Sequence, residues 1–263
     1  MQTIVNYSTL AFEIYCLSIC KMSRRSKKQA VDTDPELGDD IFNGDWLMDF
    51  NIRKPFYFKP KHQEFYDLLR SNTTNMALVD GPAGTAKTYI AVYAALEMLR
   101  LQEVEKIVYI RSIVESADKS LGSLPGEIDD KFSPYMMPLI EKVTEICGPG
   151  TCTMLKSKGL IDAIPVNFVR GLTFNNTCVI VDEAQNLTKG ELTTIMTRFG
   201  RNSQYVICGD CRQADIRQSG FKDVFDRFSD DECDTNGIHT TEFGLSEIVR
   251  SKILRFICKK LGA

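Results

Sequence analysis

The sequence is poor in the residues that usually mark metal centres and disulfide frameworks. Only two histidines, His62 and His239, occur among its 263 residues. Nine cysteines are present, but the one close pair, Cys208 and Cys211, has no second pair at the spacing of a zinc finger. An odd cysteine count, with several thiols inside apolar runs, is typical of reduced cysteines in a cytosolic protein. We therefore expect neither structural zinc nor a disulfide framework.

Long hydrophobic runs and a strong excess of one charge are also missing. The apolar patch at residues 10–20 is about half as long as a membrane span and contains Glu13. The 32 basic and 35 acidic residues leave a net charge of −3, which excludes the strongly positive field of a dedicated nucleic-acid wrapper. This balance leaves open whether the protein binds nucleic acid at a local site. We expect a cytoplasmic protein with no membrane partner.

What remains is an ordinary globular composition, with 43% hydrophobic and 25% charged residues. Residues 1–45 are predicted to be a disordered N-terminal extension, because a basic run and an acidic run follow each other there with few large apolar side chains. Met22 is an alternative first residue of the translated chain. Residues 46–263 are predicted to form one domain.

Within this predicted domain, short β-rich runs alternate with segments of helical periodicity. This alternation predicts an α/β fold with a mainly parallel sheet flanked by helices. The expected strands are residues 76–79, 106–110, 165–169, 178–181, 204–208 and 238–242. The expected amphipathic helices are residues 87–101, 187–199, 220–228 and 245–261.

The most informative segment is a glycine-rich turn, GPAGTAKT, between an apolar strand and a helix. Such a turn in this context is what a phosphate-binding loop requires. We expect Lys87 to reach the β- and γ-phosphates of a nucleotide and the Thr88 hydroxyl to ligate Mg²⁺. The alternative is a glycine turn that only caps the helix. The expected nucleotide-binding residues of the loop are Gly81, Pro82, Ala83, Gly84, Thr85, Ala86, Lys87 and Thr88.

Ala86 is the one departure from the usual loop pattern, which has glycine before the lysine. If this position needs a positive φ, alanine costs about 1–2 kcal/mol there. A loop whose other parts are intact can tolerate that cost. The departure bears more on the rate of turnover than on nucleotide binding.

Two carboxylates follow the apolar run TCVIV. Asp182 and Glu183 are expected at the carboxyl end of this strand, which is the edge where parallel sheets bind ligands. Asp182 would hold Mg²⁺ through Thr88 or water, and Glu183 would orient and deprotonate the attacking water. The alternative is that the pair caps a helix that begins near Leu187.

A further apolar strand leads into the polar segment GDCRQAD, which contains Gln213. Gln213 is expected at the same edge of the sheet as the phosphate-binding loop, where it can sense the γ-phosphate or the attacking water. A plain connection between a strand and a helix would need no such role.

Several motifs together resemble one family. They are GPAGTAKT, YIRS, GSLPGEIDDKFSPYMMPL, FVRGLTF, VIVDEAQN and CGDCRQAD, and they are spread over residues 60–258. The chain is similar to the PhoH-like ATPases, a phosphate-starvation-inducible family whose core resembles the first motor domain of superfamily 1 helicases. The resemblance implies a RecA-like P-loop NTPase fold.

The resemblance also implies roles for individual residues. Gln63 matches the glutamine that reads the adenine edge, for which a bidentate amide is suited. Gln213 matches the glutamine sensor, and Arg250 lies where relatives carry an arginine that approaches the γ-phosphate. The alternatives are that Gln63 is a surface residue on an N-terminal helix and that Arg250 is a charge on a C-terminal amphipathic helix.

Nucleic acid, either RNA or single-stranded DNA, is the partner that the resemblance implies. It would lie along the sheet edge near Arg111, Ser112 and Arg170, where cations and hydroxyls can meet phosphates. The two arginines can instead form salt bridges with nearby acidic loops. A homo-oligomer is also implied, a hexamer being the form reported for relatives, and this fits an arginine supplied in trans.

The leading hypothesis is a magnesium-dependent ATPase with ATP and Mg²⁺ as cofactors, whose catalytic residues are Lys87, Glu183, Gln213 and Arg250. A nucleotide-gated scaffold that assembles but hydrolyses ATP very slowly is the alternative, motivated by Ala86 and by the lack of a second motor domain. A small-molecule kinase would share the phosphate-binding loop but would not explain the combination of DEAQN with GDCRQ.

Overall fold

The computed structural model describes residues 50–55, 58–112 and 128–262, and for residues 128–134 it describes the backbone only. The predicted N-terminal extension, residues 1–45, lies outside these ranges. Among the described residues, no helix combines the length and apolar content that a bilayer crossing needs.

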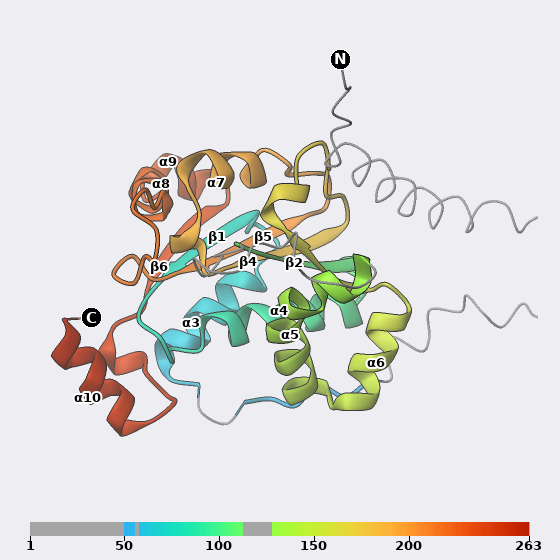
Figure 1. Cartoon of the computed structure of the whole chain (residues 1–263), viewed down its shortest axis with the longest axis horizontal. Coiled ribbons are helices and arrows are strands. Elements are labelled where there is room, and N and C mark those ends of the chain that lie inside the picture. The colour runs from blue at the N-terminus through green and yellow to red at the C-terminus, as the bar shows by residue number, and fades with distance from the viewer. Residues whose placement is uncertain (1–49, 56–57, 113–127, 263) are drawn as a thin grey trace, which may run out of the picture. The chain divides into compact units, whose positions relative to one another are not determined.

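Six parallel strands form a single sheet in the order β3-β2-β4-β5-β1-β6 (Figure 1). The predicted α/β fold with a parallel sheet is thus confirmed. Because every strand runs the same way, all carboxyl ends meet at one edge of the sheet, where open α/β folds bind ligands. The strands are β1 (Met76–Asp80), β2 (Lys106–Arg111), β3 (Ile161–Pro165), β4 (Thr177–Asp182), β5 (Gln204–Gly209) and β6 (Ile238–Glu242).

Helices cover both faces of the sheet (Figure 1). One face carries α3 (Pro60–Leu69), α4 (Lys87–Arg100), α5 (Ile128–Cys147) and α6 (Pro149–Ser157). The other face carries α7 (Lys189–Met196), α8 (Phe221–Arg227) and α9 (Asp231–Thr235). The C-terminal helix α10 (Lys252–Leu261) lies apart from both layers.

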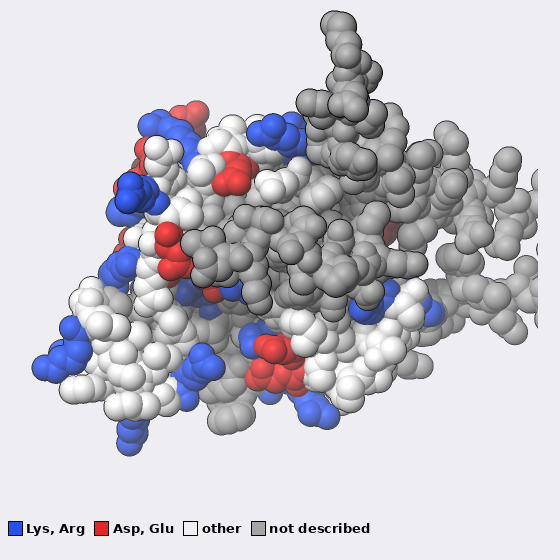
Figure 2. Space-filling view, in the orientation of Figure 1, with Lys and Arg blue, Asp and Glu red and all other residues white. Residues whose placement is uncertain are grey.

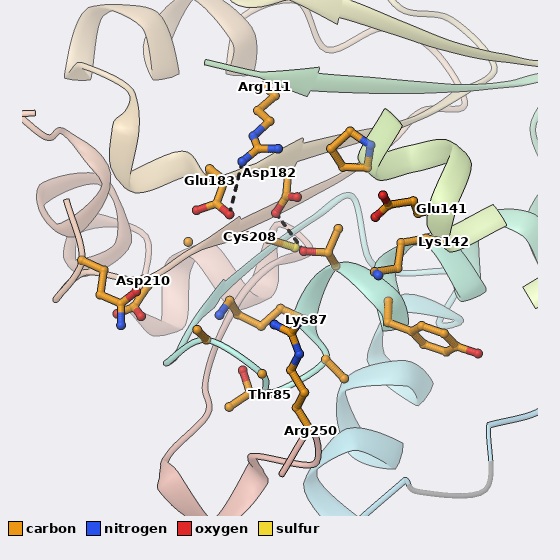
Figure 3. A pocket seen from close by; sticks show the side chains of 18 of the residues that line it. Thr85, Lys87, Arg111, Glu141, Lys142, Asp182, Glu183, Cys208, Asp210 and Arg250 are labelled. Atoms are coloured by element: carbon orange, nitrogen blue, oxygen red, sulfur yellow. Dashed lines mark hydrogen bonds and ion pairs between the residues drawn. The ribbon is translucent and has the colours of Figure 1, made fainter. Parts of the chain in front are cut away.

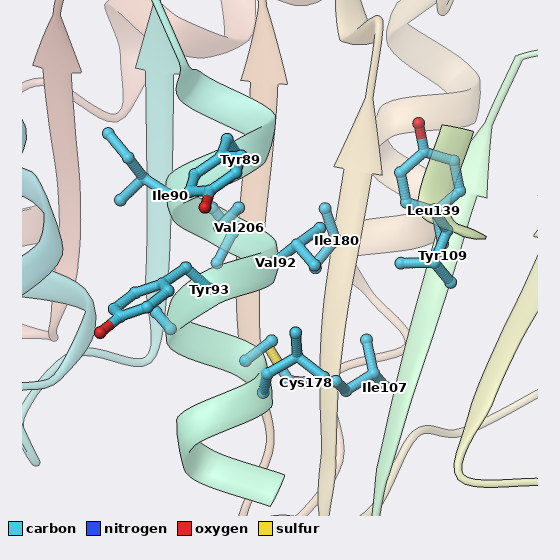
Figure 4. Close-up of a cluster of buried hydrophobic side chains, with 14 of the residues drawn as sticks. Tyr89, Ile90, Val92, Tyr93, Ile107, Tyr109, Leu139, Cys178, Ile180 and Val206 are labelled. Carbon is cyan, nitrogen blue, oxygen red and sulfur yellow. The ribbon is translucent and has the colours of Figure 1, made fainter. Parts of the chain in front are cut away.

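The core is divided by the sheet into two apolar layers. The larger layer is centred on α4, whose residues Tyr89–Leu96 are all buried against α3, α5 and the sheet (Figure 4). The smaller layer packs α7 and α8 on the opposite face, with Leu192 and Phe221 fully buried. Each fully buried aliphatic side chain stabilises the fold by about 1.5–3 kcal/mol. This packing fixes the strand ends that carry the polar residues.

The position of one predicted strand is wrong. The sequence predicts an extended segment at residues 165–169, but β3 spans Ile161–Pro165 and Val166–Phe168 form a 3-10 turn. β3 lies at the edge of the sheet, and Pro165 is its last residue, opposite Arg111. An edge strand tolerates proline there because the missing N–H interrupts no ladder.

Two predicted helices begin later than expected. The helix expected at 187–199 is α7, which starts after Thr188, whose hydroxyl accepts a hydrogen bond from Glu191 N at 3.3 Å. The helix expected at 245–261 is interrupted: Leu245–Glu247 form a 3-10 turn, and α10 starts only after Ser251. The apolar residues Ile248 and Val249, which precede Ser251, lie instead against Gly84 of the phosphate-binding loop.

Candidate nucleotide-binding site

The phosphate-binding loop connects β1 to α4. Gly84 and Ala86 both have left-handed backbones, with φ values of 82° and 64°. At Gly84 an added Cβ would lie 2.5 Å from Leu254 Cδ2, so the end of the Leu254 side chain would have to shift. Ala86 therefore occupies the position where the usual pattern has glycine, and it carries the expected strain of about 1–2 kcal/mol.

The ammonium group of Lys87 turns back over the loop. Its Nζ donates to the carbonyl oxygen of Gly81 at 2.5 Å and to that of Pro82 at 3.1 Å. Thr85, which is fully buried, donates from Oγ1 to the same Pro82 oxygen at 2.8 Å. These contacts hold the Lys87 ammonium group beside the loop that precedes the N-terminus of α4. A cation next to a helix N-terminus favours a bound phosphate.

A cavity of about 700 Å³ lies in front of this loop (Figure 3). Its size falls within the range of small-molecule sites. Most of the predicted site residues line it: Ala83, Gly84, Thr85, Ala86, Lys87, Thr88, Asp182, Glu183, Gln213 and Arg250. Residues that are more than 160 positions apart in the sequence thus meet at the carboxyl edge of the sheet, as the strand pattern predicts.

Asp182 is held between two hydroxyl groups. Its Oδ1 accepts a hydrogen bond from Thr88 Oγ1 at 2.8 Å, and its Oδ2 accepts one from Tyr109 OH at 2.5 Å. Burial, and the negative charge of Asp182 beside it, raise the pKa of Tyr109. Tyr109 therefore remains a proton donor and fixes the orientation of the carboxylate.

Glu183 has a left-handed backbone, with φ 53° and ψ 42°, which is costly for a residue with a Cβ. Its carboxylate has a partner on each side. Arg111 Nη2 lies 3.7 Å from Oε1, and Gln185 Nε2 donates to Oε2 at 2.6 Å. Backbone strain of this kind clusters at functional sites.

The chemistry of Thr88 and Asp182 fits magnesium. Among the described residues, no group of three or more histidine, cysteine or carboxylate side chains could hold a metal ion by itself. Magnesium, however, usually takes one or two protein oxygens and completes its shell with phosphate oxygens and water. The Thr88 hydroxyl and the Asp182 carboxylate, 2.8 Å apart, offer such a pair beside the phosphate-binding loop.

Gln213 and Arg250 reach the cavity from two other segments. Gln213 follows β5 in a turn in which its N–H donates to Asp210 O at 3.1 Å. Arg250 lies between the last 3-10 turn and α10, and Val249 N donates to Gly84 O at 3.0 Å, which fastens this segment onto the loop. Arg250 thus lines the cavity of its own chain.

Gln63, by contrast, is not among the residues that line the cavity. It lies on α3 and donates from Nε2 to Asp67 Oδ1 on the same helix at 2.8 Å. Its adenine-reading role stays a prediction. Gly81 and Pro82 also do not line the cavity, but their carbonyl oxygens position Lys87.

Other lining residues were not predicted. Asp210 is 5% exposed, and its Oδ2 has no hydrogen-bond partner. Burial raises the pKa of its carboxyl group. The signal that could have found it is its position in GDCRQAD, the polar segment that follows an apolar strand and also contains Gln213. Glu141, Lys142 and Glu145 also line the cavity from α5, a helix that the periodicity analysis did not predict.

The three residues expected along a nucleic-acid path, Arg111, Ser112 and Arg170, have different surroundings. Arg111 lines the nucleotide cavity and pairs with Glu183, as the salt-bridge alternative anticipated. Ser112 lines a second cavity, and Arg170 is exposed and lines neither. The expected nucleic-acid path along these residues stays a prediction.

A solved structure with a related fold is the large terminase of a thermophilic bacteriophage. The two share 12% identity, and the match covers 79% of this chain and 50% of the terminase chain with a TM-score of 0.50. At this identity the likeness concerns the fold alone.

Curated relatives are more similar in sequence. The chain is 32% identical over 213 residues to a PhoH-like protein of Mycobacterium tuberculosis (strain ATCC 25618 / H37Rv), covering 79% of this chain and 58% of the relative. It is 35% identical over 174 residues to a PhoH-like protein of Bacillus subtilis, covering 66% of this chain and 54% of the relative. It is 34% identical over 178 residues to the protein PhoH of Escherichia coli K12, covering 66% of this chain and 49% of the relative.

The chain therefore spans about half the length of the curated relatives that it matches. The model of the family described as PhoH-like protein matches residues 58–261, which include the whole cavity lining. Together with the strand–loop–helix geometry of residues 76–100, this match shows that the chain belongs to the PhoH-like protein family, a family of P-loop NTPase fold.

Proposed function

We propose that this protein binds and hydrolyses ATP with magnesium and that hydrolysis is coupled to single-stranded RNA or DNA. The observation that carries the proposal is the hydrogen bond of 2.8 Å between Thr88 and Asp182. It joins the phosphate-binding loop to the acidic strand end, which are the two halves of a magnesium–nucleotide site in P-loop enzymes.

Each side chain then has a defined task. Lys87 neutralises the β- and γ-phosphates, and Thr88 and Asp182 would hold the magnesium ion, which supplies charge neutralisation at the phosphates. Gln213 and Arg250, which line the same cavity, would approach the γ-phosphate. Catalysis at such a site consists of positioning and electrostatic stabilisation, because the protein forms no covalent bond to the phosphoryl group.

Glu183 is the base in this proposal. Its carboxylate must turn from Arg111 toward a water molecule at the γ-phosphate. The ion pair is about two-fifths exposed on each side, so its loss costs at most about 1 kcal/mol. Glu183 can therefore leave Arg111 at little cost once a nucleotide and water offer it another partner.

The same contacts favour the second candidate, a nucleotide-gated scaffold with little hydrolysis. Arg111 and Gln185 hold the Glu183 carboxylate between them, and while both contacts persist they restrain it from turning toward a water molecule at the γ-phosphate. Nucleotide would then bind and drive assembly without turnover. The two candidates differ in whether the rate depends on Glu183.

Assembly of several copies is part of the proposal, and α10 supports it. Four apolar side chains on this helix are 44% to 77% exposed: Ile253, Phe256, Ile257 and Leu261. Figure 2 shows this region as mostly uncharged surface with basic residues at its margin. The occupant that we propose is a second copy of the chain.

Charge complementarity argues for that occupant. Lys252, Lys259 and Lys260 flank the apolar face of α10, whereas the exposed helix α9 carries acidic residues in its first turn. A contact between α10 of one copy and α9 of the next is heterologous, and such contacts close into rings when the rotation permits. Because Leu254 packs on Gly84, this contact would also adjoin the nucleotide cavity.

The decisive experiment is steady-state ATP hydrolysis with magnesium by the native chain and by Glu183→Gln. We expect the substitution to lower kcat by about 10²- to 10⁴-fold, the range for losing a general base. Glu141→Gln, which changes a carboxylate in the same cavity without an assigned role, is the matched control and should retain activity. Single-stranded RNA or DNA should raise the native rate.

Two results would contradict the ATPase proposal. One is negligible native turnover, and the other is turnover that is indifferent to Glu183→Gln. Nucleotide-dependent assembly without turnover would instead support the scaffold.

A further inference from the structure

A second cavity, of about 370 Å³, opens at the carboxyl edge of the sheet. It begins where β2 ends, at Ser112, and continues past the segments that follow β3 and β4. Hydroxyl, amide and guanidinium groups line most of it: Ser112, Asn167, Asn186, Thr188, Arg217 and Gln218. Neither the phosphate-binding loop nor any catalytic residue proposed above belongs to this lining.

One short turn joins this cavity to the nucleotide cavity. The 3-10 turn Ala184–Asn186 directly follows Glu183. Glu183 and Gln185 line the nucleotide cavity, whereas Asn186 lines the second cavity. A displacement at Asn186 therefore acts on the adjoining backbone of Gln185 and, through this short turn, on that of Glu183.

The loop that follows β5 forms hydrogen bonds with two adjacent residues of this turn. Asp210 N donates to Gln185 Oε1 at 3.0 Å. Asn186 and Asp215 exchange two hydrogen bonds, of 3.0 Å from Asn186 Nδ2 and of 2.8 Å to Asn186 Oδ1. Because the turn and the loop are bound to each other at two points, we expect them to move together.

The lining fits an unpaired nucleotide better than a second nucleoside triphosphate. Its volume lies near the lower limit of small-molecule sites, and the amides of Asn167 and Gln218 can donate and accept at the edge of one base. Arg217 is exposed at the cavity, where a guanidinium can stack on a base or contact a phosphate. Among the described lining residues there is neither a lysine nor a glycine that could build a phosphate loop.

Glu191 is the acidic group in this lining, and its charge is already engaged. Its Oε2 accepts hydrogen bonds from Thr188 N and Thr188 Oγ1, both at 2.8 Å, in a capping box at the start of α7. A carboxylate at a helix N-terminus is compensated by the helix dipole. Glu191 therefore repels a nearby phosphate less than a free carboxylate would.

We infer that the second cavity binds one unpaired nucleotide of the single-stranded polymer, and that the turn Ala184–Asn186 relays this binding to Glu183. The inference rests on the proposed function, since it assigns a place to the polymer that stimulates hydrolysis. It further assigns a physical route for the stimulation, from Asn186 along the turn to the ion pair between Glu183 and Arg111.

The test uses Asn167→Ala and Arg217→Ala, which change side chains that line the second cavity and not the nucleotide cavity. Arg201→Ala is the matched control, because Arg201 is exposed and precedes β5, at the opposite edge of the sheet. Binding of fluorescein-labelled oligo(U) and oligo(dT) is measured by anisotropy. Magnesium-dependent ATPase is measured with and without each oligomer.

We expect each cavity variant to bind the better oligomer about tenfold more weakly than the native chain, consistent with the loss of one base contact. Both variants should lose stimulation and keep the basal rate, whereas Arg201→Ala should behave as the native chain. Tighter binding of oligo(U) or of oligo(dT) identifies the polymer, and either result supports the inference.

Three results would overturn the inference. They are native-level oligomer binding by both cavity variants, an equal loss in Arg201→Ala, and no oligomer binding by the native chain. The basal ATPase rate, measured in the same samples, separates these outcomes from failure of the proposed function, because hydrolysis without polymer does not depend on the second cavity.

Discussion

Two residues at the nucleotide cavity, Ala86 and Glu183, have left-handed backbones although both carry a Cβ. At Glu183 the strained backbone places the carboxylate between Arg111 and Gln185, and both contacts offset part of the strain energy. At Ala86 the methyl group makes no hydrogen bond that would offset the strain. The conformation there is set by the loop, which must turn directly into α4.

Replacing Ala86 by glycine should therefore stabilise the protein. The relief of about 1–2 kcal/mol of strain exceeds the entropic cost of glycine, about 0.5–1 kcal/mol, so the free energy of unfolding should rise by up to about 1 kcal/mol. Urea unfolding measures it. Ala91→Gly, in the buried interior of α4, is the control and should lower the free energy of unfolding by about 1 kcal/mol or more. Equal destabilisation by both substitutions would show that Ala86 is not strained.

At the scale of elements, the start of α3 depends on a buried histidine. Lys59 N donates to His62 Nδ1 at 3.1 Å, and the His62 ring packs edge-on against Phe243 with centroids 5.2 Å apart. Burial, together with the charge of Lys59, lowers the pKa of His62 below its ordinary value of 6.5. The folded state thus favours neutral His62. As the pH falls, His62 takes up a proton at a higher pH in the unfolded chain than in the folded protein.

The free energy of unfolding should consequently fall as the pH drops below about 6.5, because the unfolded state then binds more protons than the folded state. His62→Gln retains an acceptor for the capping contact but cannot titrate. We expect this variant to show a flatter dependence of the free energy of unfolding on pH between about 5 and 7, measured by urea unfolding. His239→Gln, which changes the other histidine, is the comparison. An unchanged slope in His62→Gln would contradict the assignment.

At the scale of the whole molecule, the proposed contact between copies is formed by the apolar face of α10. Phe256, which is 54% exposed, lies in the middle of that face. Phe256→Glu should weaken self-association by at least about tenfold. The substitution removes a buried aromatic contact from the centre of the interface, and the new carboxylate would lose its hydration there without gaining a partner. Sedimentation velocity over a range of concentrations measures this. Arg201→Glu, away from α10, should leave the assembly intact, and native assembly by Phe256→Glu would remove α10 from the interface.

Local patterns explain how much of the site could be predicted. The loop from Gly81 to Thr88 and the pair Asp182–Glu183 each lie beside an apolar strand, so their position at one edge of a parallel sheet followed from the strand pattern. The predicted start of β3 was wrong because Pro165 ends an edge strand instead of opening a new one. The helix expected from residue 245 begins only after Ser251 for a similar reason. The segment before Ser251 is held on the phosphate-binding loop by the hydrogen bond from Val249 N to Gly84 O, so its apolar residues do not form a helical turn of α10.

The sequence alone determined the order of most strands and helices along the chain, the phosphate-binding loop and the acidic strand end, because each depends on a few neighbouring residues and a repeating apolar pattern. Only the tertiary structure decided which distant side chains meet. Tyr109 fixes Asp182, Arg111 restrains Glu183, and the segment around Val249 closes over Gly84. Such contacts depend on the sheet order β3-β2-β4-β5-β1-β6, and packing selects that order from the whole set of apolar faces.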